Sequence, residues 1–124
     1  MRLKLHDQSY SICKLANTDK ISDIIKLDGF VAFTKTDKEL SLVCKSACSN
    51  ADLIEQDTGW SLIEIEGPLD FSMTGVLSTI TEPLAKAEIS LFAISTFDTD
   101  YFLVKTSSVA ATILCLKKSG HIFV

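Results

Sequence analysis

Cysteine and histidine are the residues of this chain whose types most readily suggest chemistry. The cysteines are Cys13, Cys44, Cys48 and Cys115, and the histidines are His6 and His121. A structural zinc site needs two closely spaced cysteine pairs or nearby histidines, whereas here only Cys44 and Cys48 are close in sequence. We therefore expect reduced thiols, with Cys13 and Cys115 packed at apolar positions, and no metal site.

The sequence also lacks the motifs of several common catalytic sites. The chain contains no nucleophile elbow, no phosphate-binding loop and no dinucleotide glycine fingerprint. An acylphosphatase-type reaction would need an arginine in a phosphate loop and an asparagine, but Arg2, Asn17 and Asn50 do not lie in suitable loops. We expect a protein that is not an enzyme and that carries no cofactor.

Two groups of polar residues could instead bind charged groups. Ser72, Thr74 and Gly75 precede an expected helix, whose free amide N–H groups and partial positive charge would suit a carboxylate. Asp98 and Asp100 flank an expected hairpin turn, and carboxylates there would suit an ammonium or another basic group. Whether the loop and the turn meet at one edge depends on the direction of the strands.

The second half of the chain alternates between strand and helix patterns. The expected elements are a strand at 60–66, a helix with an apolar face of Met73, Leu77, Ile80, Leu84 and Ala87, strands at 89–95 and 100–105, a helix from Ser107 or Ser108 that ends at Gly120, and a strand at 121–124. Pro83 removes one hydrogen bond inside the first helix and should bend or loosen it. The order βαββαβ predicts an α+β, ferredoxin-like fold.

The first half resembles the second at an offset of 61 positions, with residues 32–43 matching residues 93–104. We expect a strand at Tyr10–Leu15, a short helix at Asp19–Leu27 and a reduced second helix at Ser49–Glu55. The two halves predict a reduced N-terminal unit at residues 1–58 and a full unit at residues 59–124.

Composition and charge limit the kinds of binding partner and the cellular compartment that we expect for this protein. The 124 residues carry a net charge of −4, and Arg2 is the single arginine, so a phosphate-rich nucleic acid is not an expected partner. The apolar runs are about four residues long, far below the ~20 that a membrane helix needs. The first seven residues do not have the pattern of a signal peptide. We expect a cytoplasmic protein that is not bound to a membrane.

Three segments resemble the ACT-domain family: residues 66–77, 82–87 and 89–105, which include the run Ser95-Thr96-Phe97-Asp98-Thr99-Asp100. Within that family, the chain is similar to the small tandem ACT proteins related to the CASTOR arginine sensors and to the regulatory domains of aspartate kinases. The resemblance implies a regulatory module that binds a free amino acid between paired ACT units. It also implies a homodimer and a regulated protein partner. Glu88 departs from the family, which usually has glycine there, and a left-handed backbone would cost on the order of 1–2 kcal/mol.

The resemblance and the charge chemistry together select the candidate ligand-binding residues. They are Asp70, Phe71, Ser72, Thr74, Gly75, Thr96, Phe97, Asp98 and Asp100. Residues 59–124 contain seven acidic residues and four lysines, a net charge of −3, which favours a cationic amino acid.

Each candidate also has a structural explanation. Asp98 could form the hydrogen bonds of a turn, Asp70 could stabilise the helix start, and Thr96 could satisfy strand propensity. Phe97 could shield a pocket or contact a second protein, while Tyr101 and Trp60 are assigned to packing. An ACT-fold interaction module without a ligand is therefore the alternative function.

Overall fold

The computed structural model describes residues 1–16, 21–46, 53–67 and 74–124. Its elements are β1 (Arg2–Leu15), α1 (Ile21–Ile25), β2 (Ala32–Lys35), β3 (Leu40–Lys45), β4 (Leu53–Ile65), α2 (Ser78–Lys86), β5 (Phe92–Ser95), β6 (Asp100–Lys105), the 3-10 helix η2 (Thr106–Ser108), α3 (Val109–Lys118) and β7 (Ile122–Phe123). They form two compact units: a C-terminal unit of Met1–Asp7 with Ser61–Val124, and an N-terminal unit of Gln8–Trp60. The long strands β1 and β4 each contribute residues to both units.

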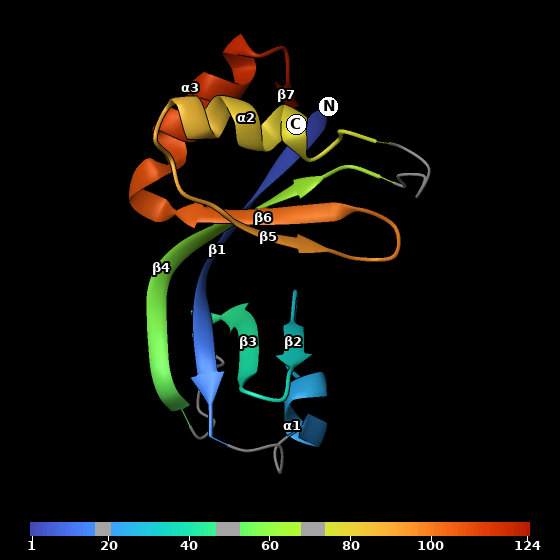
Figure 1. Cartoon of the computed structure of the whole chain (residues 1–124), viewed down its shortest axis with the longest axis vertical. Coiled ribbons are helices and arrows are strands. Elements are labelled where there is room, and N and C mark those ends of the chain that lie inside the picture. The colour runs from blue at the N-terminus through green and yellow to red at the C-terminus, as the bar shows by residue number, and fades with distance from the viewer. Residues whose placement is uncertain (17–20, 47–52, 68–73) are drawn as a thin grey trace. The chain divides into compact units, whose positions relative to one another are not determined.

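The C-terminal unit has the expected βαββαβ order, from β4 through α2, β5, β6 and α3 to β7. Its strands are hydrogen-bonded in the order β7-β1-β4-β6-β5, and α2 and α3 lie on one face of them (Figure 1). The fold is therefore the α+β, ferredoxin-like one that the sequence predicts. The expected strand at 100–105 matches β6, whereas β5 and β7 are shorter than their expected ranges.

One strand of this unit comes from the start of the chain. The beginning of β1 lies between β4 and β7 and pairs in parallel with β7, with Arg2 opposite Ile122 and Leu3 opposite Phe123. Residues 1–58 were expected to form one N-terminal unit, but Met1–Asp7 belong to the C-terminal unit. Leu3 explains this placement, because its side chain is completely buried in the C-terminal core.

The core of the C-terminal unit lies between its strands and its two helices. The buried residues are Leu3, Ile63, Ile65, Phe102 and Val104 from the strands, with Ile80, Leu84 and Leu116 from the helices. In β4 and β6 these residues alternate in sequence, so they share the face of the sheet that the helices cover. Ile80 and Leu84 are members of the apolar helix face that the sequence predicts.

Pro83 lies inside α2 without ending the helix. In an α-helix, the amide N–H of residue 83 would donate to the carbonyl of Thr79, but proline has no N–H. The His121 ring lies beside that carbonyl, with Nε2 3.0 Å from the Thr79 oxygen. Since a carbonyl can only accept, Nε2 carries the proton and His121 replaces the hydrogen bond that Pro83 removes.

Both helices of the C-terminal unit end in the same backbone motif. After α2, the amides of Glu88 and Ile89 donate to the carbonyls of Ala85 and Leu84, and Glu88 has φ +59°. After α3, the amides of Gly120 and His121 donate to the carbonyls of Lys117 and Leu116, and Gly120 has φ +94°. These are Schellman motifs, in which a left-handed residue follows the helix. Glu88 thus occupies a position that favours glycine.

The N-terminal unit pairs its strands in the order β2-β3-β1-β4 and has a core around Cys13, Leu42 and Cys44. Burial raises the pKa of the Cys13 thiol, and a hydrogen bond with Cys44 partly offsets this. Its helix α1 ends at Ile25, two residues before the expected Leu27, and the expected start at Asp19 lies outside the described residues. The expected second helix at Ser49–Glu55 is wrong at Leu53–Glu55, which begin β4; its other residues lie outside the described ones. The strand pattern was missed because four consecutive polar residues and Gly59 interrupt the alternation.

The two units contain similar hairpins, β2–β3 and β5–β6. Their paired residues correspond at an offset of 60 positions, one fewer than the offset that the sequence comparison gave. The equivalent pairs are Ala32–Val43 with Phe92–Leu103, and Lys35–Leu40 with Ser95–Asp100. A shift of one residue exchanges the two faces of a strand, so the buried positions correspond only at the offset of 60.

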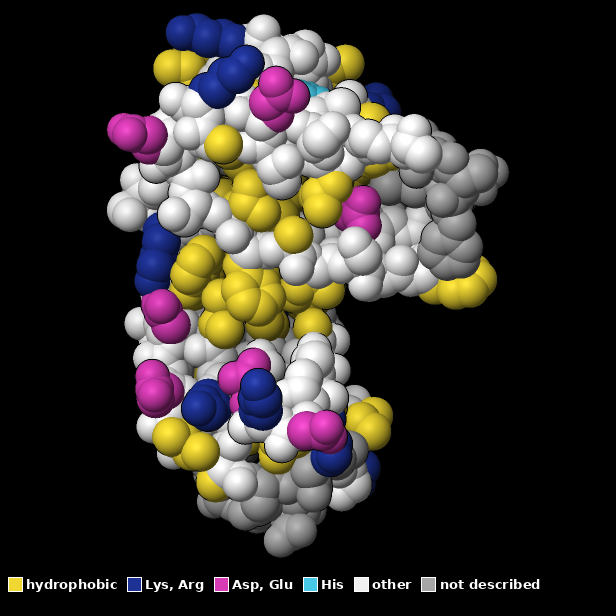
Figure 2. Space-filling view, viewed as in Figure 1, with side chains coloured by type: hydrophobic (Ala, Val, Ile, Leu, Met, Phe, Trp, Pro, Cys, Tyr) yellow, Lys and Arg dark blue, Asp and Glu magenta, His cyan; other side chains and the backbone are white. Residues whose placement is uncertain are grey.

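Charged side chains of both signs lie over the helices of the C-terminal unit (Figure 2). Within the residues that the structure describes, no helix is long and apolar enough to cross a membrane.

Candidate functional site

The turn between β5 and β6 lies against the end of β4. The Thr99 hydroxyl donates to the carbonyl of Ile65, the last residue of β4. Gly67 is equally close: a Cβ atom there would lie 2.9 Å from Cβ of Thr99 and 3.0 Å from the Asp98 carbonyl oxygen. Glycine is required at 67 because the turn leaves no room for a side chain. The loop that follows β4 and the turn at residues 96–99 therefore begin at the same edge of the C-terminal unit.

Thr96 holds the turn together. Its amide donates to the carbonyl of Thr99, its hydroxyl lies 3.0 Å from the same oxygen, and the Thr99 amide donates back to the Thr96 hydroxyl. The equivalent turn of the N-terminal unit uses Thr36 and Glu39 in the same manner. The Thr96 hydroxyl thus has the structural role that the sequence left open.

Asp98 is exposed at the turn, and Asp100 is half-buried at the start of β6. Within the described residues, no hydrogen bond or ion pair engages either carboxylate. Thr96 makes the hydrogen bonds that the turn needs, so Asp98 is not required for them. Both carboxylates can therefore attract a positively charged group.

The phenol of Tyr101 reports the electrostatic character of this edge. Its pKa is raised, first by burial and then by the negative charges of Glu64 and Asp98. Both effects disfavour the phenolate. Glu64 also lies 3.0 Å from Nε2 of His6, across β4 and β1. The neighbourhood of Tyr101 is negative, which is the condition for binding a cation.

The helix that follows the loop begins without a side-chain cap. Gly75 has φ +71°, a conformation that favours glycine, and its carbonyl accepts from the Ser78 hydroxyl at 2.8 Å. The Thr79 hydroxyl donates to the Val76 carbonyl at 2.7 Å. The hydroxyls of the first turn therefore donate to carbonyls and do not cap its amides, while the amides of Thr79 and Ile80 donate to the backbone carbonyls of Gly75 and Leu77.

Six of the nine residues that the sequence predicts to bind a ligand lie in the described part of the chain. Asp70, Phe71 and Ser72 lie outside the described residues. Thr74 and Gly75 are exposed before α2, and Phe97 is 79 % exposed at the tip of the turn. Thr96, Phe97, Asp98 and Asp100 share the β5–β6 hairpin.

Sequence reasoning missed four residues of this edge: Glu64, Gly67, Thr99 and Tyr101. The sequence pattern assigned Tyr101 to packing. The contact of Thr99 with Ile65 joins residues 34 positions apart, so no local pattern could have indicated it. Among the described residues, no group of three His, Cys, Asp or Glu side chains could hold a metal ion.

Comparison with known proteins identifies the family to which this α+β fold belongs. The family model of the ACT domain matches residues 55–118, and a second model, of an N-terminal domain, matches residues 8–49. The chain belongs to the ACT-domain family.

Individual proteins are also similar to this chain. The human protein named cytosolic arginine sensor for mTORC1 subunit 1 is 31% identical over 96 residues, which cover 72% of this chain and 29% of that protein. The chain thus spans less than a third of the length of the curated relatives it matches. A crystal structure from Agrobacterium tumefaciens is 35% identical, with a TM-score of 0.88, over 99% of this chain and 91% of the other.

The regulatory subunit of aspartate kinase from Thermus thermophilus shares the fold. It has a TM-score of 0.67 at 8% identity and covers 94% of this chain and 95% of that chain.

Proposed function

We propose that the chain is a non-catalytic regulatory module that binds a free amino acid at the edge where the 67–75 loop and the 96–99 turn begin. The observation that carries the proposal is the pair of carboxylates, Asp98 and Asp100, without described partners at the edge where the loop that leads to α2 begins. A relative named as an arginine sensor supports the same class of ligand.

In this proposal, the acidic residues and the helix start bind opposite ends of the amino acid. Asp98, Asp100 and Asp70 attract its ammonium group or a cationic side chain. Ser72, Thr74 and the backbone at Gly75 bind its carboxylate. Phe71, Phe97 and Thr96 cover the ligand and exclude water.

The proposal includes a second ACT unit and a partner protein that responds to ligand binding. ACT units paired in a homodimer would complete the site, and ligand binding would change the contacts that the module makes with a regulated partner. We place the protein in the cytosol, as the name of its curated relative states for that protein.

A thermal-shift screen with the free amino acids at millimolar concentration tests the proposal, because a ligand that binds the folded state raises the melting temperature. We expect a cationic amino acid to give the largest shift, with calorimetry confirming saturable binding. If no amino acid binds below millimolar concentration, the sensing function is wrong.

Asp100→Asn should weaken that binding by at least about tenfold, because it removes the charge and keeps the shape of the side chain. The melting temperature without ligand should stay within a few degrees. Asp37→Asn is the matched control, since Asp37 is an exposed aspartate in the equivalent turn of the N-terminal unit. Equal effects of the two substitutions on affinity would exclude Asp100 from the site.

The alternative function is an interaction module without a ligand. It is favoured by one observation, the 79 % exposure of Phe97 at the tip of the turn, because a large exposed aromatic side chain suits a protein contact. Phe97→Ser would then abolish self-association or partner binding while the amino acids produce no thermal shift.

A further inference from the structure

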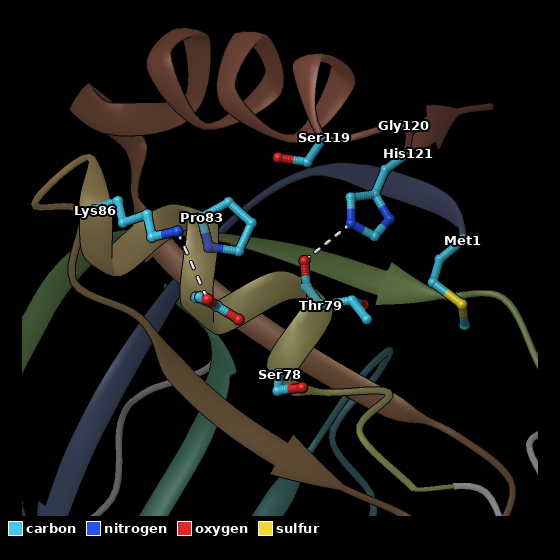
Figure 3. A pocket seen from close by; sticks show the side chains of 9 residues that line it. Met1, Ser78, Thr79, Pro83, Lys86, Ser119, Gly120 and His121 are labelled. Carbon is cyan, nitrogen blue, oxygen red and sulfur yellow. Dashed lines mark hydrogen bonds and ion pairs between the residues drawn. The ribbon is translucent and has the colours of Figure 1, made fainter.

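A hollow lies in the C-terminal unit at the first turns of α2, where Ser78 lines it and donates to the Gly75 carbonyl. Its volume is about 480 Å³, and it is lined by Met1, Ser78, Thr79, Glu82, Pro83, Lys86, Ser119, Gly120 and His121. One wall is the polar side of α2, and the opposite wall is the end of α3 with the segment that follows it (Figure 3). None of the residues predicted to bind an amino acid lines it.

The hydroxyl groups in this hollow have already used their protons. Ser78 donates to the Gly75 carbonyl at 2.8 Å and Thr79 to the Val76 carbonyl at 2.7 Å. Ser119 donates to the Cys115 carbonyl at 3.2 Å. A hydroxyl that has donated its proton still has lone pairs, so all three can only accept a hydrogen bond from a bound molecule.

His121 adds another acceptor. Its ring is 7% exposed, and Nε2 donates to the Thr79 carbonyl, so the neutral ring has a lone pair on Nδ1. Nδ1 is buried and has no hydrogen-bond partner among the described residues. In Figure 3 this nitrogen faces away from Thr79 and toward Met1, which lines the same hollow. An unpaired buried polar atom is costly, and a donor from an occupant would satisfy it.

Two residues with charged side chains, Glu82 and Lys86, also line the hollow. Glu82 and Lys86 are paired at 3.6 Å, but their side chains are 69% and 78% exposed. An exposed pair of this kind contributes little to stability, so the Glu82 carboxylate can exchange its partner for a bound cation. The hollow therefore offers three hydroxyl acceptors, one imidazole acceptor and one carboxylate, beside the ammonium group of Lys86.

We propose that this hollow between α2 and the end of α3 binds a small organic cation with primary ammonium groups. One ammonium group pairs with Glu82 and the hydroxyl acceptors, and a second donor reaches Nδ1 of His121 when the unbranched Met1 side chain moves aside. This site shares no lining residue with the proposed amino acid site.

Nuclear magnetic resonance of the two histidine rings tests the proposal on the full chain. His6 and His121 are the two histidines, and their ring nitrogens can be followed while putrescine, a diammonium probe, is added at constant ionic strength. We expect a saturable shift of the His121 Nδ1 signal with His6 nearly unchanged. Butanediol, the uncharged diol of the same length, should give no comparable shift. Equal responses to both probes, or an unmoved Nδ1 signal, would overturn the site.

Two variants locate the binding. Glu82→Gln should weaken putrescine binding about tenfold, whereas Glu88→Gln, which removes an exposed charge outside the hollow, should change it less than about twofold. Equal losses would indicate diffuse charge attraction and reject the site. Asp100→Asn should keep the His121 response, and its loss there would assign putrescine to the acidic turn instead.

Discussion

Tyr101 links the charge of the proposed amino acid site to a property that can be measured without any ligand. Its phenol lies half-buried in β6, within the influence of the Glu64 and Asp98 carboxylates. A negative neighbourhood of this kind attracts cations and resists the formation of a further anion. Burial is the larger cause of the raised pKa of Tyr101, and the two carboxylates raise it further.

Because the pKa of Tyr101 is raised in the folded chain, the folded state holds the phenolic proton more tightly than the unfolded state does. Its contribution to stability is complete below about pH 10, the ordinary tyrosine value, and is lost as the pH rises through the folded pKa. We expect Tyr101→Phe to reduce the alkaline loss of stability. Urea unfolding at a series of pH values up to about 11 measures this difference. An identical alkaline slope in the variant would contradict the assigned environment.

At the scale of elements, the two helix ends of the C-terminal unit provide an internal comparison. Both end in a Schellman motif, but one has Glu88 at the left-handed position and the other has Gly120. Glu88→Gly should raise the free energy of unfolding by about 1 kcal/mol, and Gly120→Ala should lower it by about 1 kcal/mol or more. A Cβ atom at Gly120 would meet nothing within 4 Å, so the loss there would come from the backbone alone. Chemical denaturation measures both changes, and opposite signs are the decisive result.

Pro83 and His121 form a second pair that can be tested at this scale. His121→Phe keeps a ring of similar size but leaves the Thr79 carbonyl without a donor, so it should cost about 1–3 kcal/mol. In a Pro83→Ala background, the amide of residue 83 can supply that hydrogen bond. The same His121 substitution should then cost less by about 1 kcal/mol. A double-mutant cycle measures the coupling, and purely additive effects would show that His121 does not compensate for the proline.

At the scale of the whole molecule, the two compact units are not two separable stretches of sequence. The start of β1 supplies a strand and the buried Leu3 to the C-terminal unit, while the rest of β1 belongs to the N-terminal unit. A fragment of residues 59–124 would lack the strand that lies between β4 and β7. The boundary predicted at residues 58 and 59 is therefore not a position at which the chain can be divided.

Leu3→Ala should destabilise the C-terminal unit by about 2–5 kcal/mol, as expected for a large-to-small change at a fully buried position. Lys4→Ala, at the neighbouring exposed position, is the control and should change stability by less than about 0.5 kcal/mol. Denaturant unfolding of both variants compares them. Similar small effects would show that the first residues are dispensable for this unit.

The sequence by itself determined the secondary structure order of residues 60–124 and the family of the chain. These features are local: the period of the apolar residues in α2, the turn residues between β5 and β6, and Gly120 after α3 all act within a few positions. The sequence also indicated that Glu88 conflicts with a left-handed helix end, because the Schellman motif is set by neighbouring residues.

Contacts between distant residues were decided only in the tertiary structure. The placement of Leu3 beside β7, the hydrogen bond of Thr99 with Ile65 and the donation from His121 to Thr79 each join segments far apart in sequence. Such contacts depend on how strands pair and how helices cover them, and many sequence patterns fit the same pairing. The register of the repeat was wrong by one position for the same reason, since only the cross-strand hydrogen bonds fix which residues face each other.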